Sequence, residues 1–266
     1  MKKILLIAVI TVIAAAPFFA ENIYTKNGYH IEDIEEKINL SKSKTVTVTN
    51  KNGSVNLEQW SKDYAEIKVQ KIARKKDDLN YIEIKNNNTA QRLEIFTDFS
   101  SKNLSDIAVN YTIRIPKNCT VEMIKTSNGA IEVSNITSDI EMKTSNGPIR
   151  ADNVSGTVNA YSSNGPVSIK DAGSIGRIIT SNGPVEADVP DIDNDCTIKT
   201  SNAPVNISLK GFSGIINAGT SNGAIKVEGK GLTIDKLDEN QLKASAGDKN
   251  VTLSIVTSNS RITIKR

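Results

Sequence analysis

The chain has 266 residues, of which 38% are hydrophobic, 24% are charged and 5% are aromatic, and its formal net charge is +3 at pH 7. This near balance argues against a nucleic-acid-binding protein, which usually carries a marked basic excess in a stripe or patch. A single histidine excludes a histidine-rich zinc site. The length is sufficient for one elongated domain or two compact domains with a sizeable core.

The first residues predict export. Two lysines precede an apolar run from Ile4 to Ala16, which is the layout of a secretory signal peptide. The run is shorter than the about 20 residues that span a membrane. We predict a signal peptide over residues 1–20, with an uncleaved anchor as the alternative, because Phe18 occupies a position where cleavage favours a small residue. The expected location is the periplasm, the cell envelope or the medium, with no transmembrane span after signal removal.

Alternating apolar residues then predict β-strands. The stretch 45–60, TVTVTNKNGSVNLEQW, alternates, turns at Asn52-Gly53 and alternates again. Stretch 31–40 has the apolar spacing of a helix but fits an extended cap equally well. We therefore predict a less regular β region and cap over residues 21–117. Its further alternating runs lie at residues 65–72, 80–86, 92–99 and 108–116.

Two features of this region are candidates for ligand contact. Trp60 and Tyr64 lie near a predicted turn, where they either seal one end of the core or stack on a sugar. The run 71–76, KIARKK, is the densest basic cluster of the chain. It indicates either a solvated strand end or loop, which we favour, or a site for an anionic polymer.

A Thr-Ser-Asn-Gly turn, or a close variant, recurs seven times in the second half of the chain. Apolar residues stand four places before each asparagine and three and five places after it, so each copy has the period of two that is typical of strands. The successive spacings are 18, 18, 18, 20, 20 and 37 residues, and we expect one degenerate copy in the last gap. The asparagines are Asn128, Asn146, Asn164, Asn182, Asn202, Asn222 and Asn259.

The repeat favours stacked coils over hairpins. Asn-Gly is a strong hairpin signal that needs positive φ at both residues. However, Ala203 and Ser260 replace the glycine in two copies, whereas asparagine itself tolerates positive φ. We predict an all-β fold in which residues 118–266 form a single-stranded, right-handed parallel β-solenoid (β-helix). Each coil would contain about 18–20 residues and stack on the previous one.

Stacking predicts a role for each residue of the motif. Equal positions fall above one another, so the seven asparagines would form a structural column whose side-chain amides hydrogen-bond from coil to coil. We expect the asparagines and the threonines two places before them to point inward, and the intervening serines to point outward. The motif then serves the architecture rather than a ligand.

The chain resembles a bacterial family of exported or envelope proteins labelled putative adhesins, a domain of unknown function with β-solenoid architecture. The segment VTVTNKNGSVNLEQW with the AEIKV that follows, the segment YTIRIPKN and the TSNG copies from Thr126 onward carry the resemblance. It covers about residues 45–266. The resemblance implies a β-solenoid with repeated Ser-Asn-Gly turns and an adhesin-like role, and it supplies no catalytic residues.

Few residues suggest chemistry. His30 stands alone, without local support for a catalytic triad. The stretch containing Asp191, Asp193 and Asp195 begins like a calcium loop but lacks its glycine and distant glutamate, so we favour a polar bulge, with calcium as a weak alternative. We expect no cofactor.

The two cysteines are expected to remain free. Cys119 and Cys196 hold different positions in coils about four apart, on the order of 19 Å, whereas a disulfide needs Cα atoms within about 7 Å. We therefore predict two buried thiols.

A polysaccharide-cleaving enzyme built from stacked coils would need a cluster of carboxylates on an outer face. The outward position four places after each asparagine shows no such cluster. We therefore predict a non-enzymatic, exported protein of the cell envelope, an adhesin or scaffold that presents an elongated polar surface to an unidentified protein or glycan. The alternative is a carbohydrate-binding or carbohydrate-active β-helix protein. The outward residues are Glu132, Arg150, Ser168, Glu186, Asn206, Lys226 and Thr263.

Overall fold

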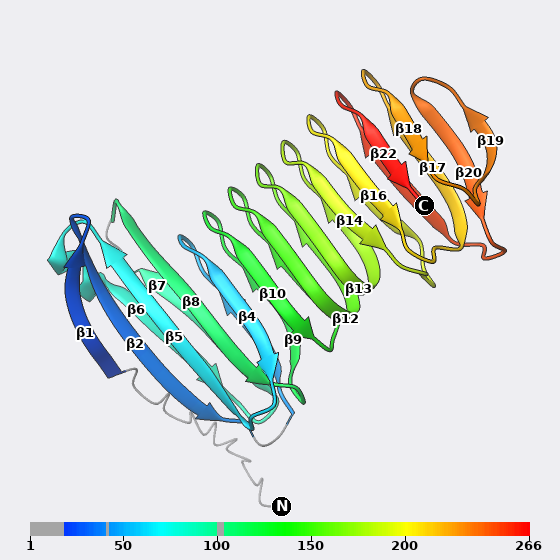
Figure 1. Ribbon diagram of the computed structural model, residues 1–266. Coiled ribbons are helices and arrows are strands. Elements are labelled where there is room, and N and C mark those ends of the chain that lie inside the picture. The colour runs from blue at the N-terminus through cyan, green and yellow to red at the C-terminus, as the bar shows by residue number, and fades with distance from the viewer. Residues whose placement is uncertain (1–18, 41–42, 100–103) are drawn as a thin grey trace, which may run out of the picture.

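The computed structural model describes residues 19–40, 43–99 and 104–266 (Figure 1). Most of the predicted signal peptide lies outside these residues. The prediction of an all-β fold is confirmed, since the described part forms one mixed sheet of 22 strands and one short 3-10 helix, η1 (Lys76–Tyr81). None of the helices described is long and apolar enough to cross a membrane.

The N-terminal strands are mostly antiparallel. Strand β2 pairs with β1 and β5, β5 pairs with β8, and β6 pairs with β7, all in antiparallel register. The stretch 31–40, which fits a helix or an extended cap, forms β2. The bounds are β1 (Phe19–Lys26), β2 (Tyr29–Asn39), β3 (Thr45–Thr49), β4 (Val55–Trp60), β5 (Tyr64–Ala73), β6 (Ile82–Asn88), β7 (Arg92–Phe99) and β8 (Ile107–Pro116).

The remaining strands begin at residue 120. Strands β12 and β13 are long and take part in both sides of the molecule. The bounds are β9 (Thr120–Lys125), β10 (Ile131–Ile136), β11 (Ile140–Lys143), β12 (Ile149–Tyr161), β13 (Val167–Ile179), β14 (Val185–Val189), β15 (Cys196–Lys199), β16 (Val205–Leu209), β17 (Gly214–Thr220), β18 (Ile225–Glu228), β19 (Thr233–Leu237), β20 (Gln241–Ala246), β21 (Thr252–Thr257) and β22 (Ile262–Lys265).

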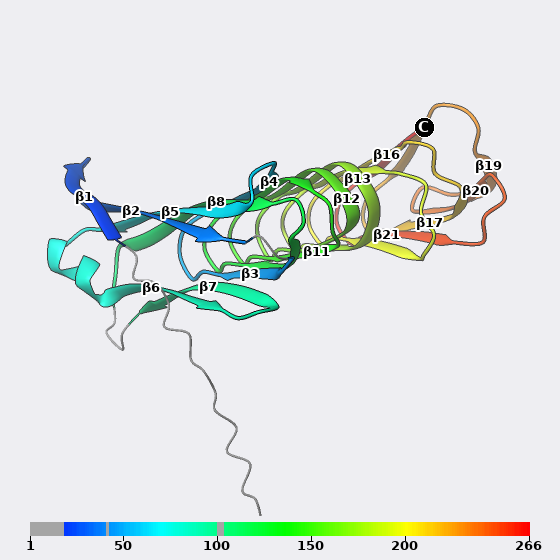
Figure 2. The ribbon, with the colours of Figure 1, turned by 90° about the horizontal axis from the view of Figure 1, so that it is seen from below.

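Successive copies of the repeat stack in parallel register. Ile131 on β10 pairs with Ile149 on β12, which pairs with Val167 on β13, and the shift is 18 residues each time. Each coil contributes one strand to each of two sides, and the coils follow one another in a row (Figures 1 and 2). Side A contains β8, β4, β10, β12, β13, β14, β16, β22 and β18, and side B contains β7, β3, β9, β11, β12, β13, β15, β21 and β17.

The core is a column of aliphatic side chains between the two sides. Ile131, Ile149, Val167 and Val185 are stacked at equivalent positions, and each is at most 1% exposed. Strand alternation places these side chains inward on every coil. The stretch 45–60 belongs to the same stack, since β4 pairs in parallel with both β8 and β10.

The Thr-Ser-Asn-Gly corner agrees with prediction only in its threonines and serines. The threonines point inward as expected: Thr144 is 7% exposed, and its hydroxyl donates to the carbonyl of Gly129 in the preceding coil at 3.0 Å. The asparagines, predicted to point inward, are exposed at all seven positions. The space inside the corner is occupied by the threonine hydroxyl and by the backbone of the glycine, so the asparagine side chain turns outward.

Glycine follows the asparagine because successive coils approach closely there. A Cβ atom built on Gly165 would lie 1.7 Å from the carbonyl oxygen of Gly147. Neither glycine has positive φ, and neither do the seven asparagines, so the expected positive φ at the corner is wrong. Ala203 and Ser260 occupy the same row, so the approach is not equally close in every coil.

The left-handed residues lie at the opposite corner instead. Asn135, Asn153 and Asp171 have φ values of 59°, 53° and 47° and are spaced by 18 residues. Asparagine and aspartate adopt this conformation more readily than other side chains. This second corner lets the chain pass from side A to side B.

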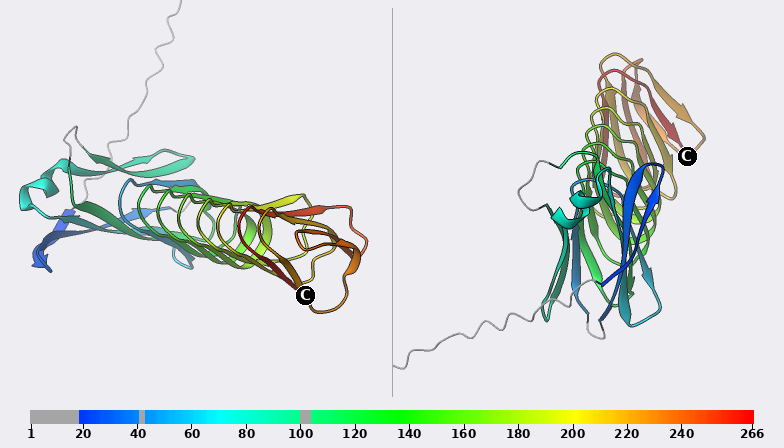
Figure 3. Two further views of the ribbon diagram at one scale, coloured as in Figure 1. Left: turned by 90° about the horizontal axis from the view of Figure 1, so that it is seen from above. Right: turned by 90° about the vertical axis from the view of Figure 1, so that its left-hand side faces the viewer.

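The coils do not all stack in chain order, which corrects a prediction. Strand β22 pairs with β16 on one side and β18 on the other, so the last strand of the chain lies between two earlier coils. The long gap in the repeat contains no degenerate copy but the antiparallel pair β19–β20, which lies at the far end in Figure 3. Chain order alone does not specify this insertion.

Candidate functional site

A continuous row of asparagine amides runs along one corner of the stack. Each side chain donates from Nδ2 to Oδ1 of the neighbouring asparagine, at distances from 2.6 to 2.8 Å. The structure brings all seven asparagines of the repeat together and adds Asn52 at the N-terminal end, through the bond from Asn128. In spatial order the row is Asn52, Asn128, Asn146, Asn164, Asn182, Asn202, Asn259 and Asn222.

This row uses only part of its hydrogen-bonding capacity. An asparagine side chain has two N–H donors and an oxygen with two lone pairs. Along the row, an inner member such as Asn164 donates one bond and accepts one. The remaining groups face solvent, because the side chains are exposed. The row therefore stiffens the corner and also presents a regular polar strip.

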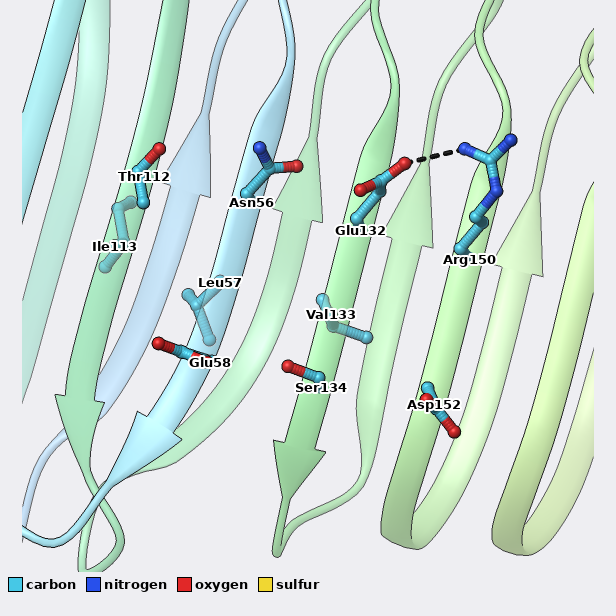
Figure 4. A pocket seen from close by; sticks show the side chains of 10 residues that line it. All are labelled: Asn56, Leu57, Glu58, Thr112, Ile113, Glu132, Val133, Ser134, Arg150 and Asp152. Atoms are coloured by element: carbon cyan, nitrogen blue, oxygen red, sulfur yellow. Dashed lines mark hydrogen bonds and ion pairs between the residues drawn. The ribbon is translucent and has the colours of Figure 1, made fainter.

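A shallow groove lies on side A, across β8, β4, β10 and β12 (Figure 4). Its volume is about 380 Å³, and its floor is the strand backbone at Leu57, Ile113 and Val133, whose buried side chains face the core. The polar side chains around it are Asn56, Glu58, Thr112, Glu132, Ser134, Arg150 and Asp152. A ligand in this groove would therefore meet hydroxyls, amides, charged groups and strand backbone.

Two carboxylates of the groove are paired with arginines. Glu132 Oε1 lies 2.6 Å from Arg150 Nη1, as the dashed line in Figure 4 marks. Glu58 Oε1 lies 2.6 Å from Arg114 Nε on the neighbouring strand. These ion pairs tie both glutamate side chains to arginines on neighbouring strands.

Acidic and basic side chains are interspersed along side A. In the row six places after the asparagines, β4, β12, β13 and β14 carry Glu58, Asp152, Lys170 and Asp188. The register places Asp152 directly beside Lys170. Lys210 adds a cation 2.7 Å from Asp188. Opposite charges on neighbouring strands neutralise each other locally, so this side presents no field of one sign.

Trp60 ends β4, two residues after Glu58 of the groove, and Tyr64 begins β5. Their rings meet edge to face with centroids 5.0 Å apart, and Trp60 Nε1 donates to the Tyr64 carbonyl at 2.9 Å. Lys62 Nζ lies 4.6 Å from the Trp60 ring centre, and the Arg114 guanidinium lies 5.6 Å from it. Cations already occupy the π-system of Trp60, so a sugar that stacks there has to displace one of them.

The three aspartates considered for calcium have protein partners. Lys249 Nζ lies 2.8 Å from Asp191 Oδ2 and 2.8 Å from Asp193 Oδ1, while Asp195 accepts the backbone N–H of Thr252 at 2.8 Å. The ammonium group holds the place that a cation would take. No cluster of three metal-ligating side chains occurs in the part of the chain that the structure describes.

The remaining reactive side chains are not gathered into a site. His30 lies on the β1–β2 hairpin, where its Nδ1 is 3.2 Å from the Thr25 hydroxyl. Cys119 and Cys196 are free and buried, as predicted. Burial raises the pKa of Cys119 and raises that of Cys196 to about 12, so both remain protonated thiols.

Sequence reasoning missed several residues of these surfaces. Asn52 was recognised as a turn residue but not as a member of the row. The second corner has its own amide contact, from Asn153 Nδ2 to Asn135 Oδ1 at 2.8 Å. A search for every polar residue that recurs at intervals of 18 residues would have found Asn135, Asn153 and Asp171. The groove could not have been found, because it combines strands from residues 55, 107, 131 and 149 onward.

Comparison with solved structures gives distant likenesses. A putative cell adhesion protein from Clostridium sporogenes ATCC 15579 is 14% identical, with 88% of this chain and 99% of that chain covered, at a TM-score of 0.37. A putative adhesin from Bacteroides fragilis NCTC 9343 is 10% identical, with 87% of this chain and 96% of that chain covered, at a TM-score of 0.35. A putative lipid binding protein from Parabacteroides distasonis ATCC 8503 is 12% identical, with 87% of this chain and 96% of that chain covered, at a TM-score of 0.31.

No family model matches the chain. No curated protein matches its sequence.

Proposed function

We propose that this chain is a non-enzymatic, exported protein of the cell envelope, an adhesin or scaffold built as a single-stranded, right-handed β-solenoid. Parallel pairing at a constant shift supports this architecture, because each coil of such a stack adds about 4.8 Å to its length. A partner would contact many residues along the stack, and no reacting group is required.

The observation that carries the proposal is the chemistry of the two long polar surfaces. Side A mixes acidic and basic side chains, and the two glutamates of its groove are bound to arginines. The asparagine row adds a strip of amides at one corner. Such surfaces offer many moderate contacts of both charge signs, which together give adhesion through multiple weak bonds.

A second candidate function is carbohydrate binding. The groove on side A favours it, because Asn56, Thr112 and Ser134 offer hydrogen bonds to the hydroxyl groups of a sugar. Trp60 stands beside the groove and provides an aromatic ring where Lys62 moves away. This candidate differs from adhesion by predicting one saturable site for a short soluble glycan.

The test uses microspheres coated with the chain and washed over isolated envelope fractions and intact cells. If contact is broad, the amount of envelope material retained on the microspheres changes less than about twofold with Glu132→Gln. It falls steeply when six of the outward residues of side A are replaced together by alanine: Glu132, Arg150, Ser168, Glu186, Asn206 and Lys226. The same fractions are assayed for released reducing sugars. Hydrolysis with a bell-shaped pH profile that disappears in Glu132→Gln would overturn the proposal.

The second candidate is tested by calorimetric titration with short soluble glycans. Saturable binding that Asn56→Ala removes, with Asn206→Ala as the matched control on β16 of the same side, would support a carbohydrate site. Absence of binding at millimolar glycan together with retention on the microspheres would leave adhesion as the function.

Export has its own test. Cell fractionation and N-terminal sequencing of the exported chain are expected to give a first residue near Glu21, after removal of residues 1–20. A chain found only in the cytoplasmic fraction would contradict export.

A further inference from the structure

The C-terminal end of the stack carries an unpartnered apolar strand edge. Strand β19 pairs with β20 alone among the described strands, and all five of its residues are exposed. Ile234 and Leu237 are 46% and 48% exposed, which places them among the three most exposed large hydrophobic side chains described. Figures 1 and 2 show β19 at the far end of the molecule, away from the coils. An open edge of this kind is a template for pairing with another strand.

Both apolar side chains of β19 lie on the same side of the hairpin. Ile234 stands opposite Ala244 and Leu237 stands opposite Leu242, and an irregularity at Asp235 shifts the register between them. Ala244 and Leu242 are 0% and 3% exposed. A bulge of this type brings residues 234 and 237 to one side, despite their odd spacing. The buried side of β20 therefore continues onto β19, where nothing in the described chain covers it.

The opposite end of the stack is closed differently. Leu79 of η1 is 2% exposed, and Ile82 at the start of β6 is 1% exposed. The cap thus covers the core at the N-terminal end, where Ile23 of the edge strand β1 is 49% exposed. The C-terminal end leaves two large apolar side chains, Ile234 and Leu237, in solvent on one strand. Association through two C-terminal ends is then favoured over head-to-tail growth, because it covers the same open edge on both copies and closes after two.

We propose that β19 pairs with β19 of a second copy of this chain, antiparallel, about a two-fold axis between Asp235 and Lys236. The segment Ile-Asp-Lys-Leu is complementary to itself in this register. Ile234 meets Leu237 of the second copy on the apolar side, and Asp235 meets Lys236 of the second copy. Each pair occurs twice, as two-fold symmetry requires. Cross-strand pairs of both kinds stabilise antiparallel sheets.

The charges of a single copy leave this pairing available. Asp235 has no cationic partner among the described residues. Lys236 Nζ lies 3.0 Å from Asp238 Oδ2 and 2.7 Å from Gln241 Oε1, and both charged side chains are about half exposed. Exposed ion pairs of this kind contribute little, so Lys236 exchanges partners readily. The dimer supplies Asp235 with the cation that it lacks.

The test is the mass of the chain in solution, measured by sedimentation equilibrium over a range of concentrations. The dimer has twice the 28.8 kDa of one chain. Asp235→Lys or Lys236→Asp alone places like charges together twice, and each is expected to weaken the dimer at least about tenfold. The double swap Asp235→Lys with Lys236→Asp restores the opposite-charge pairs and is expected to restore the dimer.

The matched control is Lys170→Asp, an equal change of charge on an exposed residue of β13 far from this edge, and it is expected to leave the dimer unchanged. Circular dichroism of every variant verifies that it is folded. A monomer at all concentrations, an open series of larger assemblies, or a double swap that dissociates as readily as the single variants would each overturn the proposal.

Discussion

The side-chain amide of Asn259 donates a hydrogen bond to Asn202 Oδ1 at 2.7 Å, although 57 residues separate the two along the chain. On its other side, Asn222 donates to Asn259 at 2.8 Å. The last strand, β22, thus restores the continuity of a row that the β19–β20 hairpin would otherwise end. The coil that carries Asn222 is held to the stack through the C-terminal residues.

A chain that stops after Asn250 is expected to lose the structured end of the stack. Truncation removes β21 and β22, with four buried aliphatic side chains of which each contributes about 2–5 kcal/mol: Leu253, Ile255, Ile262 and Ile264. Limited proteolysis is expected to cut between residues 210 and 250, while residues 107–200 remain protected. Removal of Arg266 alone is the control. Full protection of residues 210–250 in the truncated chain would show that β22 is dispensable there.

Gly165→Ala is expected to lower the free energy of unfolding by about 1–3 kcal/mol. The new Cβ would meet the carbonyl oxygen of Gly147, so the two coils have to separate. Gly219→Ala is the matched control, because a Cβ at Gly219 meets nothing within 4 Å. Urea denaturation of both variants measures the difference. Equal stability of the two variants would contradict the close approach.

The sequence predicted the strands of the repeat because burial alternates with a period of two. Ile131, Ile149 and Val167 are inward for this reason, and the inward threonines follow from the same pattern. The direction of the asparagines could not be obtained in this way, since alternation breaks down within a corner. There the backbone amides of both Ser145 and Asn146 bond to the single carbonyl of Ser127.

The order of the coils was beyond prediction for a different reason. All copies of the repeat present similar edges, so the pairing of β22 with β16 and β18 is not encoded in either partner alone. The polar composition of residues 229–251 does not reveal that they form a hairpin at the end. The groove on side A shares this difficulty, because its residues become neighbours only after stacking.

Glu36→Gln is expected to stabilise the protein at neutral pH. Burial raises the pKa of Glu36, and the Asn86 amide, which donates to both carboxylate oxygens at 3.2 and 3.0 Å, opposes this only in part. The folded protein therefore holds the carboxyl proton of Glu36 more tightly than the unfolded chain does, in which the pKa of this group is 4.5. Stability from this group is present in full below that value and is lost as the pH rises through the folded pKa.

Thermal unfolding of the wild type and Glu36→Gln from pH 4 to pH 8 measures this effect. The difference in melting temperature is expected to grow with pH and then to level off. Glu186→Gln, an exposed carboxylate on β14, is the control. A difference that is largest at pH 4 would contradict the sign.

Both thiols are expected to be unreactive in the folded protein. Cys119 and Cys196 are each 1% exposed, and burial raises the pKa of both. A disulfide reagent at pH 8 is expected to label neither in native conditions and two per chain in urea. Rapid labelling of one thiol in the native protein would show that a coil opens locally.

The measurement that tests the account most directly is the triple variant Asn146→Ala, Asn164→Ala and Asn182→Ala, compared with Ser145→Ala, Ser163→Ala and Ser181→Ala. Loss of the hydrogen bonds between the asparagine side chains is expected to lower the free energy of unfolding by about 0.5–1.5 kcal/mol per residue. The folded variant is expected to adhere to envelope fractions as well as the serine control does. Unchanged stability together with lost adhesion would contradict the account and identify the asparagine row as the ligand-binding surface.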